Sequence, residues 1–591
     1  MLRSRSYPAP PMRARLLAAT LAALLVPAAS AQAGDPIMPL GEVKPGLQCT
    51  GYSVVRGTDV VPFGIEVIDV IDDRSTGSGP RIMVKASGAA VDETGIGPGF
   101  SGSPIYCPGA DGTARVIGAI SEAIGEYGGK VVLATPIESM LGQPVDPPAG
   151  PVSRADREAA GAARTLTAPL TVSGLDSRLG EALRRAAAEQ GRLVMTAPPA
   201  GPLGSFPPQT LVPGSAMGVG YAEGDINASA IGTVSYVDGD RVWGFGHPLD
   251  GVGARSLLLQ DAYIFRVINN PNASFDSYGS YKYGAAGHSL GTLTSDGLNA
   301  VAGRIGVLPA TVPVRITAKD LDTGAEKVVA TNVADEAAVD QPTGGSLLSL
   351  IAPLAVSQSA GTVLGGSPAR LTGRACFTVR LRELRDPARF CNRYVSDFPD
   401  PLGAGNVVAG AASADLADAL VQVDGYKAGE VHVTGVEGAV EIGRGQRQAF
   451  LRKVVLPRTV RKGTREVPAT VVLRHVRGPR EARRMTVKLP RDLRPGKRTV
   501  VFVGKDVDFS EADLFDLFGF DFGGSAGGSL GPPNLRALVG SIEAIARYDG
   551  VMARRPGSDP ETSGPGVRSF RDRTLRISGK VRTSIRVTKR R

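Results

Sequence analysis

One serine in the chain lies between glycines on a predicted tight turn, where it could act as a nucleophile. Residues 97–106 read Gly-Pro-Gly-Phe-Ser-Gly-Ser-Pro-Ile-Tyr. Gly99 and Gly102 flank Ser101, so the backbone can bend sharply and point N–H groups at an oxyanion. Pro104 ends any helix and leads into an extended segment. The run predicts Ser101 as a nucleophile, with the N–H groups of Gly99 and Ser101 as its oxyanion hole. The alternative is a glycine-rich turn whose serine is incidental.

A serine hydroxyl is a weak nucleophile and needs a general base within hydrogen-bond reach. The chain contains four histidines, which are His247, His288, His432 and His475. His247 is the best candidate, because it follows a predicted hairpin with an Asp-Gly turn at residues 238–239 and is held between Gly246 and Pro248. His288 lies in a Gly-His-Ser run that we expect to be a loop. A structural histidine on a glycine-rich turn is the alternative for His247.

These two stretches resemble the motifs of a known peptidase family. Residues 99–104 (Gly-Phe-Ser-Gly-Ser-Pro) resemble the Gly-Asp-Ser-Gly-Gly-Pro box of chymotrypsin-like peptidases, and more closely the Gly-Met-Ser-Gly-Ser-Pro box of the SpoIVB sporulation peptidase family. Residues 232–248 contain a Gly-Thr-Val…Phe-Gly-His-Pro pattern that is similar to a second motif of the SpoIVB family. The resemblance covers roughly residues 38–320. It implies that Ser101 is the nucleophile and His247 the base.

The order of the two motifs departs from the family pattern. In chymotrypsin-like enzymes and in the sporulation peptidase, the histidine precedes the serine in the sequence, whereas here Ser101 comes first. A catalytic triad is defined by positions and roles, so a permuted pair of barrels can still assemble it. Phe100 replaces the aspartate that trypsin-like enzymes pair with a new N-terminus, so that form of activation is not available.

The acid of the triad is the least defined member. Asp296, in a Gly-Thr-x-x-x-Asp stretch of the His-bearing unit, is the predicted acid, and Asp250 is the runner-up. Either aspartate could instead cap a turn. Asp92 and Glu93 lie closer to the serine box but align poorly with the acid of the sporulation peptidase. A Ser/His pair acting alone is the remaining alternative.

The N-terminus predicts export. Several arginines precede an apolar run at residues 16–29, and Ala31-Gln32-Ala33 follows it, which is the order of a secretory signal peptide. Cleavage is expected after Ala33, with Ala31 as the near alternative. A retained anchor is disfavoured because the apolar run is short for a bilayer. The later apolar stretch at residues 347–364 contains polar residues and is expected to be a buried helix. We therefore expect a secreted or cell-surface protein with no transmembrane span after cleavage.

The cysteines form two pairs that are local in the sequence. Cys49 with Cys107 and Cys376 with Cys391 predict two disulfides in an oxidising compartment. A zinc site is disfavoured, because no Cys-x-x-Cys run or nearby histidine accompanies them. No metal or organic cofactor is expected.

The predicted fold class is mainly β, with many short strands and turns. We expect a chymotrypsin-like double β-barrel in permuted order, the Ser half before the His half, followed by a β-sandwich. The expected division is a signal peptide at 1–33, a Ser-bearing barrel half at 34–145, a linker and helix at 146–209, a His-bearing barrel half with a helical extension at 210–395, a β-sandwich at 396–510, and a loop, helix and basic tail at 511–591.

The net charge of +10 comes largely from arginine and lysine in the predicted sandwich and the C-terminal tail. Such a surface could bind an anionic cell-envelope polymer, or it could simply be solvated. Nucleic acid is disfavoured as a partner because no aromatic stacking platform accompanies the charge. The predicted function is a secreted serine endopeptidase of the SpoIVB type, self-processing included, acting on protein or peptide substrates through an acyl-enzyme. The alternative is a catalytically inactive, peptidase-like protein that binds the cell envelope.

Overall fold

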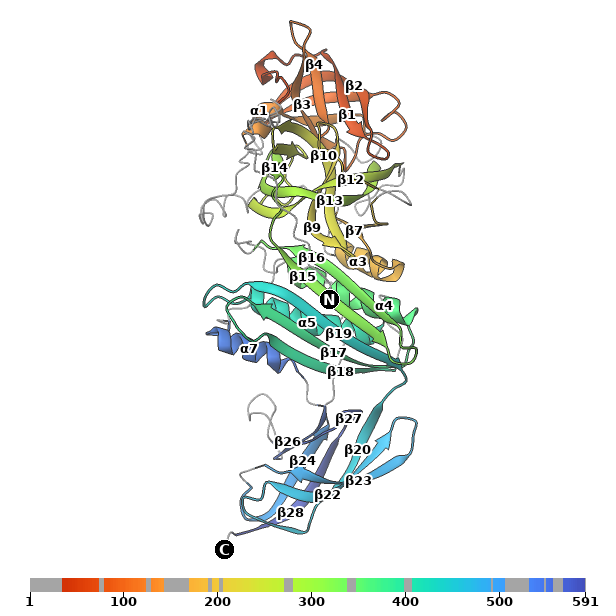
Figure 1. Ribbon diagram of the computed structural model, residues 1–591, viewed down its shortest axis with the longest axis vertical. Helices are drawn as coiled ribbons and strands as arrows, with labels where there is room; N and C mark the ends of the chain where they lie inside the picture. Colours follow the sequence, from red (N-terminus) through yellow and green to blue (C-terminus); the bar gives the residue numbers. More distant parts are fainter. Residues whose placement is uncertain are drawn as a thin grey trace, which may run out of the picture.

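The computed structural model describes residues 34–73, 79–123, 129–142, 170–189, 194–200, 206–269, 280–336, 347–397, 406–490, 493–504, 531–546, 549–555 and 567–589. The predicted signal peptide and most of the predicted linker lie outside these residues. The described part is mainly β, as the sequence predicts, and its units follow one another along the long axis (Figure 1).

The first barrel is a closed sheet near the N-terminus. Its strands are β1 (Gln48–Val54), β2 (Val60–Asp73), β3 (Gly79–Ser87), β4 (Pro104–Pro108), β5 (Ala114–Ala123) and β6 (Val131–Pro136), in the order β1-β2-β3-β6-β5-β4. Alternate residues of β3, such as Ile82, Val84 and Ala86, fill the interior. The disulfide between Cys49 and Cys107 is present and joins β1 to β4. The serine box connects β3 to β4. A 3-10 turn, η1 (Leu40–Glu42), precedes the barrel, and a short helix, α1 (Ile137–Leu141), follows it.

The second barrel follows the linker and carries the histidine motif. Its strands are β9 (Ala216–Gly224), β10 (Asn227–Asp238), β11 (Arg241–Gly244), β12 (Gly253–Asn269), β13 (Ser280–Gly297) and β14 (Ala300–Ile305). Pairing runs β9-β12-β13-β14-β11-β10, and an additional pairing of β9 with β10 closes the ring. The predicted hairpin is β10–β11, with Gly239 at a positive φ in its turn. Strands β7 (Leu170–Ser173) and β8 (Val194–Ala197) extend the sheet beyond β10, and the predicted helix α3 (Ser177–Glu189) lies between them in sequence.

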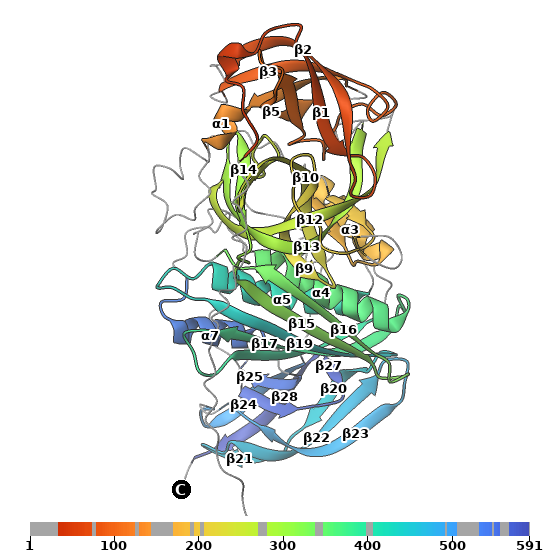
Figure 2. The same cartoon turned by 45° about the horizontal axis from the view of Figure 1, so that its top comes forward.

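The two barrels share apolar contacts. One cluster brings Ala119 and Ile137 of the first barrel against Trp243 and Ala302 of the second. Another packs Val54 of β1 against residues of the second barrel that include Ile264. Figure 2 shows the two barrels stacked end to end above the helices.

A central sheet continues from the second barrel. It contains β15 (Thr311–Asp320), β16 (Glu326–Ala334), β17 (Leu371–Leu381), β18 (Ala388–Ser396) and β19 (Val433–Arg444), and β16 pairs with β9. Helices α4 (Leu347–Leu364) and α5 (Val407–Asp424) pack against it, and α7 (Leu535–Ala544) lies beside β18. Within the described part of the chain, α4 is the one helix long and apolar enough to cross a membrane, and 61% of that stretch is buried. The second disulfide, Cys376–Cys391, links β17 to β18 as predicted.

The C-terminal unit consists of two sheets around one core. One sheet has the order β23 (Arg480–Lys488), β22 (Glu466–His475), β20 (Gln448–Val455), β27 (Arg576–Ser578), and the other β21 (Thr459–Arg461), β28 (Lys580–Thr588), β24 (Gly496–Gly504), β25 (Gly550–Arg554), β26 (Val567–Arg571). Residues 568–589, expected to be a basic tail, mostly form strands of this unit. β19 lies within the range expected to be the β-sandwich, 396–510, but it pairs in the central sheet, in parallel with β15 and antiparallel with β17.

Candidate active site

The loop that carries Ser101 is held by hydrogen bonds from the second barrel. The carbonyl of Pro98 accepts from the Lys282 N–H at 2.9 Å, and the Gly99 carbonyl accepts from the Thr233 hydroxyl at 2.9 Å. The Ser101 carbonyl accepts from the Thr233 N–H at 2.8 Å. Two strands of the second barrel, β10 and β13, therefore fix the conformation of the serine loop.

Glycine is required at both positions that flank the serine. Gly99 and Gly102 each have a φ of 92°, which side chains rarely adopt. A Cβ on Gly102 would overlap the carbonyl oxygen of Thr233 and lie 2.6 Å from the Phe245 nitrogen. The sharp turn predicted from the sequence is therefore also a point of close approach between the two barrels.

The N–H groups on either side of Phe100 form no hydrogen bond among the described residues. The N–H of Phe100 donates to Gly97, that of Gly102 to Ile120, and that of Ser103 to Phe100. The intervening N–H groups of Gly99 and Ser101 have no acceptor among the described residues. Ser101 is partly exposed, whereas Gly99, Phe100, Gly102 and Ser103 are buried. The loop thus has two backbone N–H groups without an acceptor on either side of Phe100, next to the partly exposed hydroxyl of Ser101.

The His247 turn lies against the serine loop. Besides the contact of Gly102 with Phe245, a Cβ on Gly246 would be 3.0 Å from the Ile120 carbonyl oxygen, the same oxygen that accepts from the Gly102 N–H. The Thr135 hydroxyl of β6 donates to the Gly246 carbonyl at 2.6 Å. Two motifs that are far apart in the sequence are therefore neighbours at the junction of the barrels.

The His247 ring is buried and its orientation is fixed by the backbone. Nδ1 is 2.7 Å from the carbonyl oxygen of Pro248, so Nδ1 carries the proton and donates it. Nε2 is then left with a lone pair. Burial lowers the pKa of His247, which keeps the ring neutral at neutral pH. Across the described residues, no hydrogen bond joins the Ser101 hydroxyl to this ring.

Asp296 is fully buried and bonds to the loop that follows His247 rather than to the ring. One oxygen accepts from the Leu249 N–H at 2.6 Å, and the other accepts from the N–H groups of Asp250 and Gly251 at 2.8 and 2.9 Å. Burial raises the pKa of this carboxyl, although the Arg255 guanidinium at 3.5 Å opposes the shift. The direct Asp–His hydrogen bond expected of a triad is not among those formed by the described residues.

One peptide group nevertheless connects Asp296 to His247. The Leu249 N–H that Asp296 accepts and the Pro248 carbonyl that His247 contacts belong to the same peptide unit. A carboxylate on the N–H side polarises the peptide and makes its carbonyl a stronger acceptor. Asp250, the runner-up, instead accepts from Tyr221 at 3.0 Å and pairs with Arg255 at 2.8 Å.

Lys282, which the sequence motifs do not include, lies against the serine loop. It is 1% exposed, and its ammonium donates to the hydroxyls of Ser53 at 2.7 Å and Thr233 at 3.0 Å. Nζ is also 4.6 Å from the centre of the Phe100 ring. Burial lowers the pKa of Lys282 to about 7. The one available signal was its position between Tyr281 and Tyr283 on a strand, which places the lysine on the opposite, buried face.

The carboxylate of Glu122, which belongs to neither sequence motif, acts electrostatically on His247. Burial lowers the pKa of His247, the negative charge of Glu122 on β5 raises it, and the positive charge of Arg81 lowers it. The two are paired with each other at 3.0 Å, and Arg81 donates to Asn299 at 3.2 Å. Arg81 and Glu122 belong to the first barrel, and Asn299 belongs to the turn between β13 and β14 of the second.

The other histidines lie away from the serine. His288 belongs to β13 rather than to a loop, and its Nδ1 is 3.0 Å from the buried carboxylate of Asp261. Six residues of strand, about 20 Å, separate it from Lys282. His432 contacts Glu383 at 2.6 Å and His475 contacts Glu481 at 2.8 Å, both outside the barrels.

The part of the chain that the structure describes contains no group of three or more His, Cys, Asp or Glu residues that could hold a metal ion. Comparison of the chain with protein-family models, with curated proteins and with solved structures finds no match.

Proposed function

We propose that the protein is a secreted serine endopeptidase of the SpoIVB type, in which Ser101 attacks a peptide bond at the junction of two chymotrypsin-like barrels in permuted order. The observation that carries the proposal is the pair of unused N–H groups of Gly99 and Ser101. Groups of the second barrel donate hydrogen bonds to the carbonyls of the loop, and the two N–H groups are left without an acceptor, that of Gly99 at a buried position and that of Ser101 at a partly exposed one. A preorganised pair of donors of this kind is what an oxyanion hole requires.

In this proposal His247 is the general base. Its Nε2 takes the proton of Ser101 as the hydroxyl oxygen bonds to the substrate carbonyl carbon, and the carbonyl oxygen becomes an oxyanion. Each N–H donor of the loop lowers the barrier by roughly 3–4 kcal/mol. His247 then gives the proton to the leaving amine as the peptide bond breaks, and water releases the acyl group from Ser101. No cofactor takes part.

Asp296 is a positioning residue in this scheme. Its carboxylate accepts a hydrogen bond from the Leu249 N–H. The carbonyl of the same peptide unit, that of Pro248, accepts a hydrogen bond from Nδ1 of His247. The carbonyl takes the place of the carboxylate in a conventional triad. It fixes the tautomer that leaves Nε2 able to accept a proton.

The second candidate is an inactive, peptidase-like binding protein of the cell envelope. The missing hydrogen bond between Ser101 and His247 favours it. Against it, hydrogen bonds in unliganded active sites are often long and tighten only when substrate binds. The two disulfides suggest an oxidising compartment, which supports export under either function. The C-terminal unit would be the β-sandwich of such a surface protein.

Labelling with a fluorophosphonate serine probe separates the two functions. The mature protein should be labelled, and Ser101→Ala and His247→Ala should abolish the signal. Ser584→Ala, which changes an exposed serine on β28, is the matched control and should be labelled like the wild type. Failure of the folded wild-type protein to react would favour the binding protein.

A further inference from the structure

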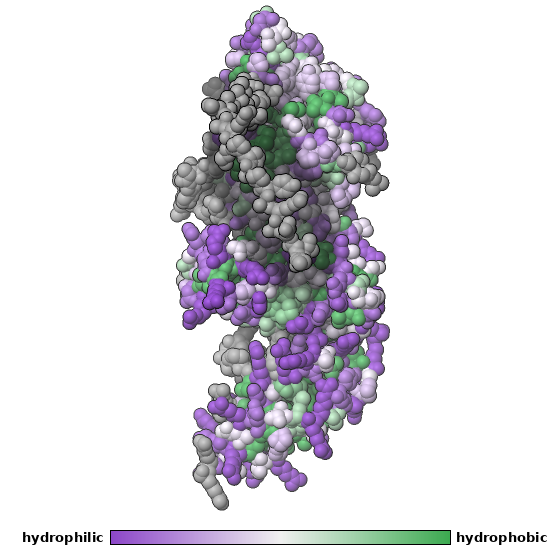
Figure 3. All heavy atoms as spheres, viewed as in Figure 1, coloured by the Kyte–Doolittle hydropathy of each residue, from purple (hydrophilic) through white to green (hydrophobic). Residues whose placement is uncertain are grey.

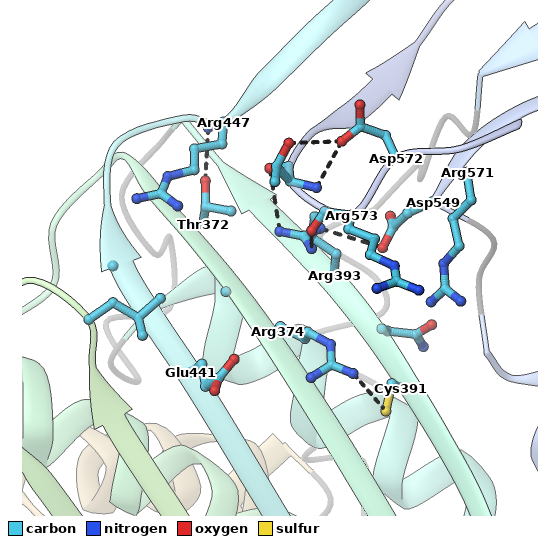
Figure 4. A pocket seen from close by; sticks show the side chains of 15 residues that line it. Thr372, Arg374, Cys391, Arg393, Glu441, Arg447, Asp549, Arg571, Asp572 and Arg573 are labelled. Carbon is cyan, nitrogen blue, oxygen red and sulfur yellow. Dashed lines mark hydrogen bonds and ion pairs between the residues drawn. The ribbon is translucent and has the colours of Figure 1, made fainter. Parts of the chain in front are cut away.

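A cavity of about 520 Å³ lies between the central sheet and the C-terminal unit (Figure 4). One wall is the exposed face of β17, β18 and β19, and the other is formed by Asp549 and the residues that join β26 to β27. Its size falls in the usual range for small-molecule sites. It is remote from Ser101 and belongs to other units of the fold.

The wall of this cavity carries more positive than negative charge. Its arginines are Arg374, Arg393, Arg447, Arg571 and Arg573, and its acids are Glu441, Asp549 and Asp572. Two of the acids are engaged: Asp549 pairs with Arg393 at 3.5 Å, and Asp572 pairs with Arg483 at 2.6 Å.

Four of the arginines form no ion pair with any described residue. These are Arg374, Arg447, Arg571 and Arg573. Arg374 contacts only the Cys391 sulfur, at 3.5 Å, and lies across from Glu441 in the strand register. The five arginines and three acids of the lining leave a net charge of about two positive units in the cavity, and Arg571 also interacts electrostatically with Asp549.

These side chains enter the cavity from both walls. Arg571 and Arg573 come from the C-terminal unit with their guanidinium groups close together, and Arg374 lies on β17 on the opposite wall with its guanidinium directed to the Cys391 sulfur (Figure 4). Like charges held this near each other repel, and an anion between them removes the repulsion. The backbone that carries Arg573 is fixed, because Arg393 donates to the carbonyls of Arg573 and Thr574. On the face shown in Figure 3, hydrophilic residues also gather over the C-terminal unit.

We propose that this cavity is a binding site for a polyvalent oxyanion, whose phosphate or carboxylate groups are held by Arg374, Arg571 and Arg573. The planar guanidinium fork donates two parallel hydrogen bonds to such a group, which a lysine does not do. Several forks facing one cavity favour a ligand with more than one anionic group. The site is independent of the proposed peptidase activity.

Isothermal titration calorimetry of the full mature protein at low salt tests the proposal, with tripolyphosphate and citrate as probes. At least one probe should bind, and Arg571→Gln/Arg573→Gln should weaken that binding by about tenfold or more. The matched control is Arg582→Gln/Arg586→Gln, which removes two exposed arginines of β28 outside the cavity, and it should change affinity by less than about twofold.

A second variant on the other wall, Arg374→Gln, guards against a local folding defect and should also weaken binding. Tighter binding of tripolyphosphate than of citrate identifies a phosphate ligand, and the reverse identifies a polycarboxylate. If neither tripolyphosphate nor citrate binds, the proposal is overturned. An equal loss in the control pair does so as well, because it would show binding to general surface charge.

Discussion

Replacing Lys282 by methionine should remove a specific pH dependence of folding. Burial holds the pKa of Lys282 at about 7 in the folded protein, against an ordinary value of 10.5. Between these two values the unfolded chain binds one more proton than the folded protein does. Stability must therefore rise with pH across this window, because the free energy that the unfolded state gains by binding the extra proton decreases as pH increases. The full gain is present only above the unfolded pKa, and it is lost as pH falls toward 7.

The size of the effect follows from the two pKa values. Between about pH 7.5 and 9.5, linkage gives a gain of about 2.5 kcal/mol in the free energy of unfolding of the wild type. Methionine keeps the apolar volume of the side chain and has no proton to lose. Lys282→Met should therefore lack this gain, and its stability relative to the wild type should fall by about 2.5 kcal/mol over the same interval.

Guanidinium unfolding followed by tryptophan fluorescence measures this difference. Trp243 is the only tryptophan and lies buried in β11, at the junction of the barrels, so its emission reports on the unit that contains Lys282. Lys85→Met, which changes an exposed lysine of β3, is the control and should show no pH-dependent difference. If the gap between Lys282→Met and the wild type stays constant from pH 7.5 to 9.5, the buried, deprotonating lysine is refuted.

Three further outcomes are expected. Asp296→Asn should lower kcat/KM by about tenfold to a hundredfold, because an amide cannot accept hydrogen bonds from all three N–H groups that donate to the carboxylate. Steady-state kinetics on a peptide substrate measures this loss. Activity should persist to a pH below the ordinary pKa of histidine, about 6.5, because burial lowers the pKa of His247 and the base stays neutral there. A profile of kcat/KM against pH in which activity is already lost on the acid side at a pH above about 6.5 contradicts the assignment. Gly102→Ala should destabilise the barrels by several kcal/mol, since its Cβ overlaps Thr233, whereas Gly112→Ala, at a similar positive φ but in open space, should cost about 1–2 kcal/mol; thermal unfolding compares them.

The local parts of the site could be predicted from the sequence. Glycine on both sides of Ser101 indicates a sharp turn, and the structure has such a turn at that place. The Asp-Gly dipeptide between two alternating strands predicted the hairpin that leads to His247, and this hairpin is β10–β11. Both signals depend on neighbouring residues only, so a single sequence contains them.

The remaining features depend on contacts between distant segments. Lys282 reaches Ser53 across 229 positions of the sequence, and no local pattern announces that pair. Asp296 was expected to face His247 directly, but the three N–H groups of the loop after His247 take up its oxygens. In the same way, β19 joins the central sheet because it pairs in parallel with β15, more than a hundred residues earlier.

A crystal structure of the mature protein after reaction with a peptidyl phosphonate tests the central claim most directly. We expect a bond between phosphorus and the Ser101 oxygen. A phosphonyl oxygen should lie about 2.7–3.1 Å from the nitrogens of Gly99 and Ser101, and Nε2 of His247 should face the adduct. An unmodified Ser101, or an adduct whose oxygen points away from those two nitrogens, would contradict it.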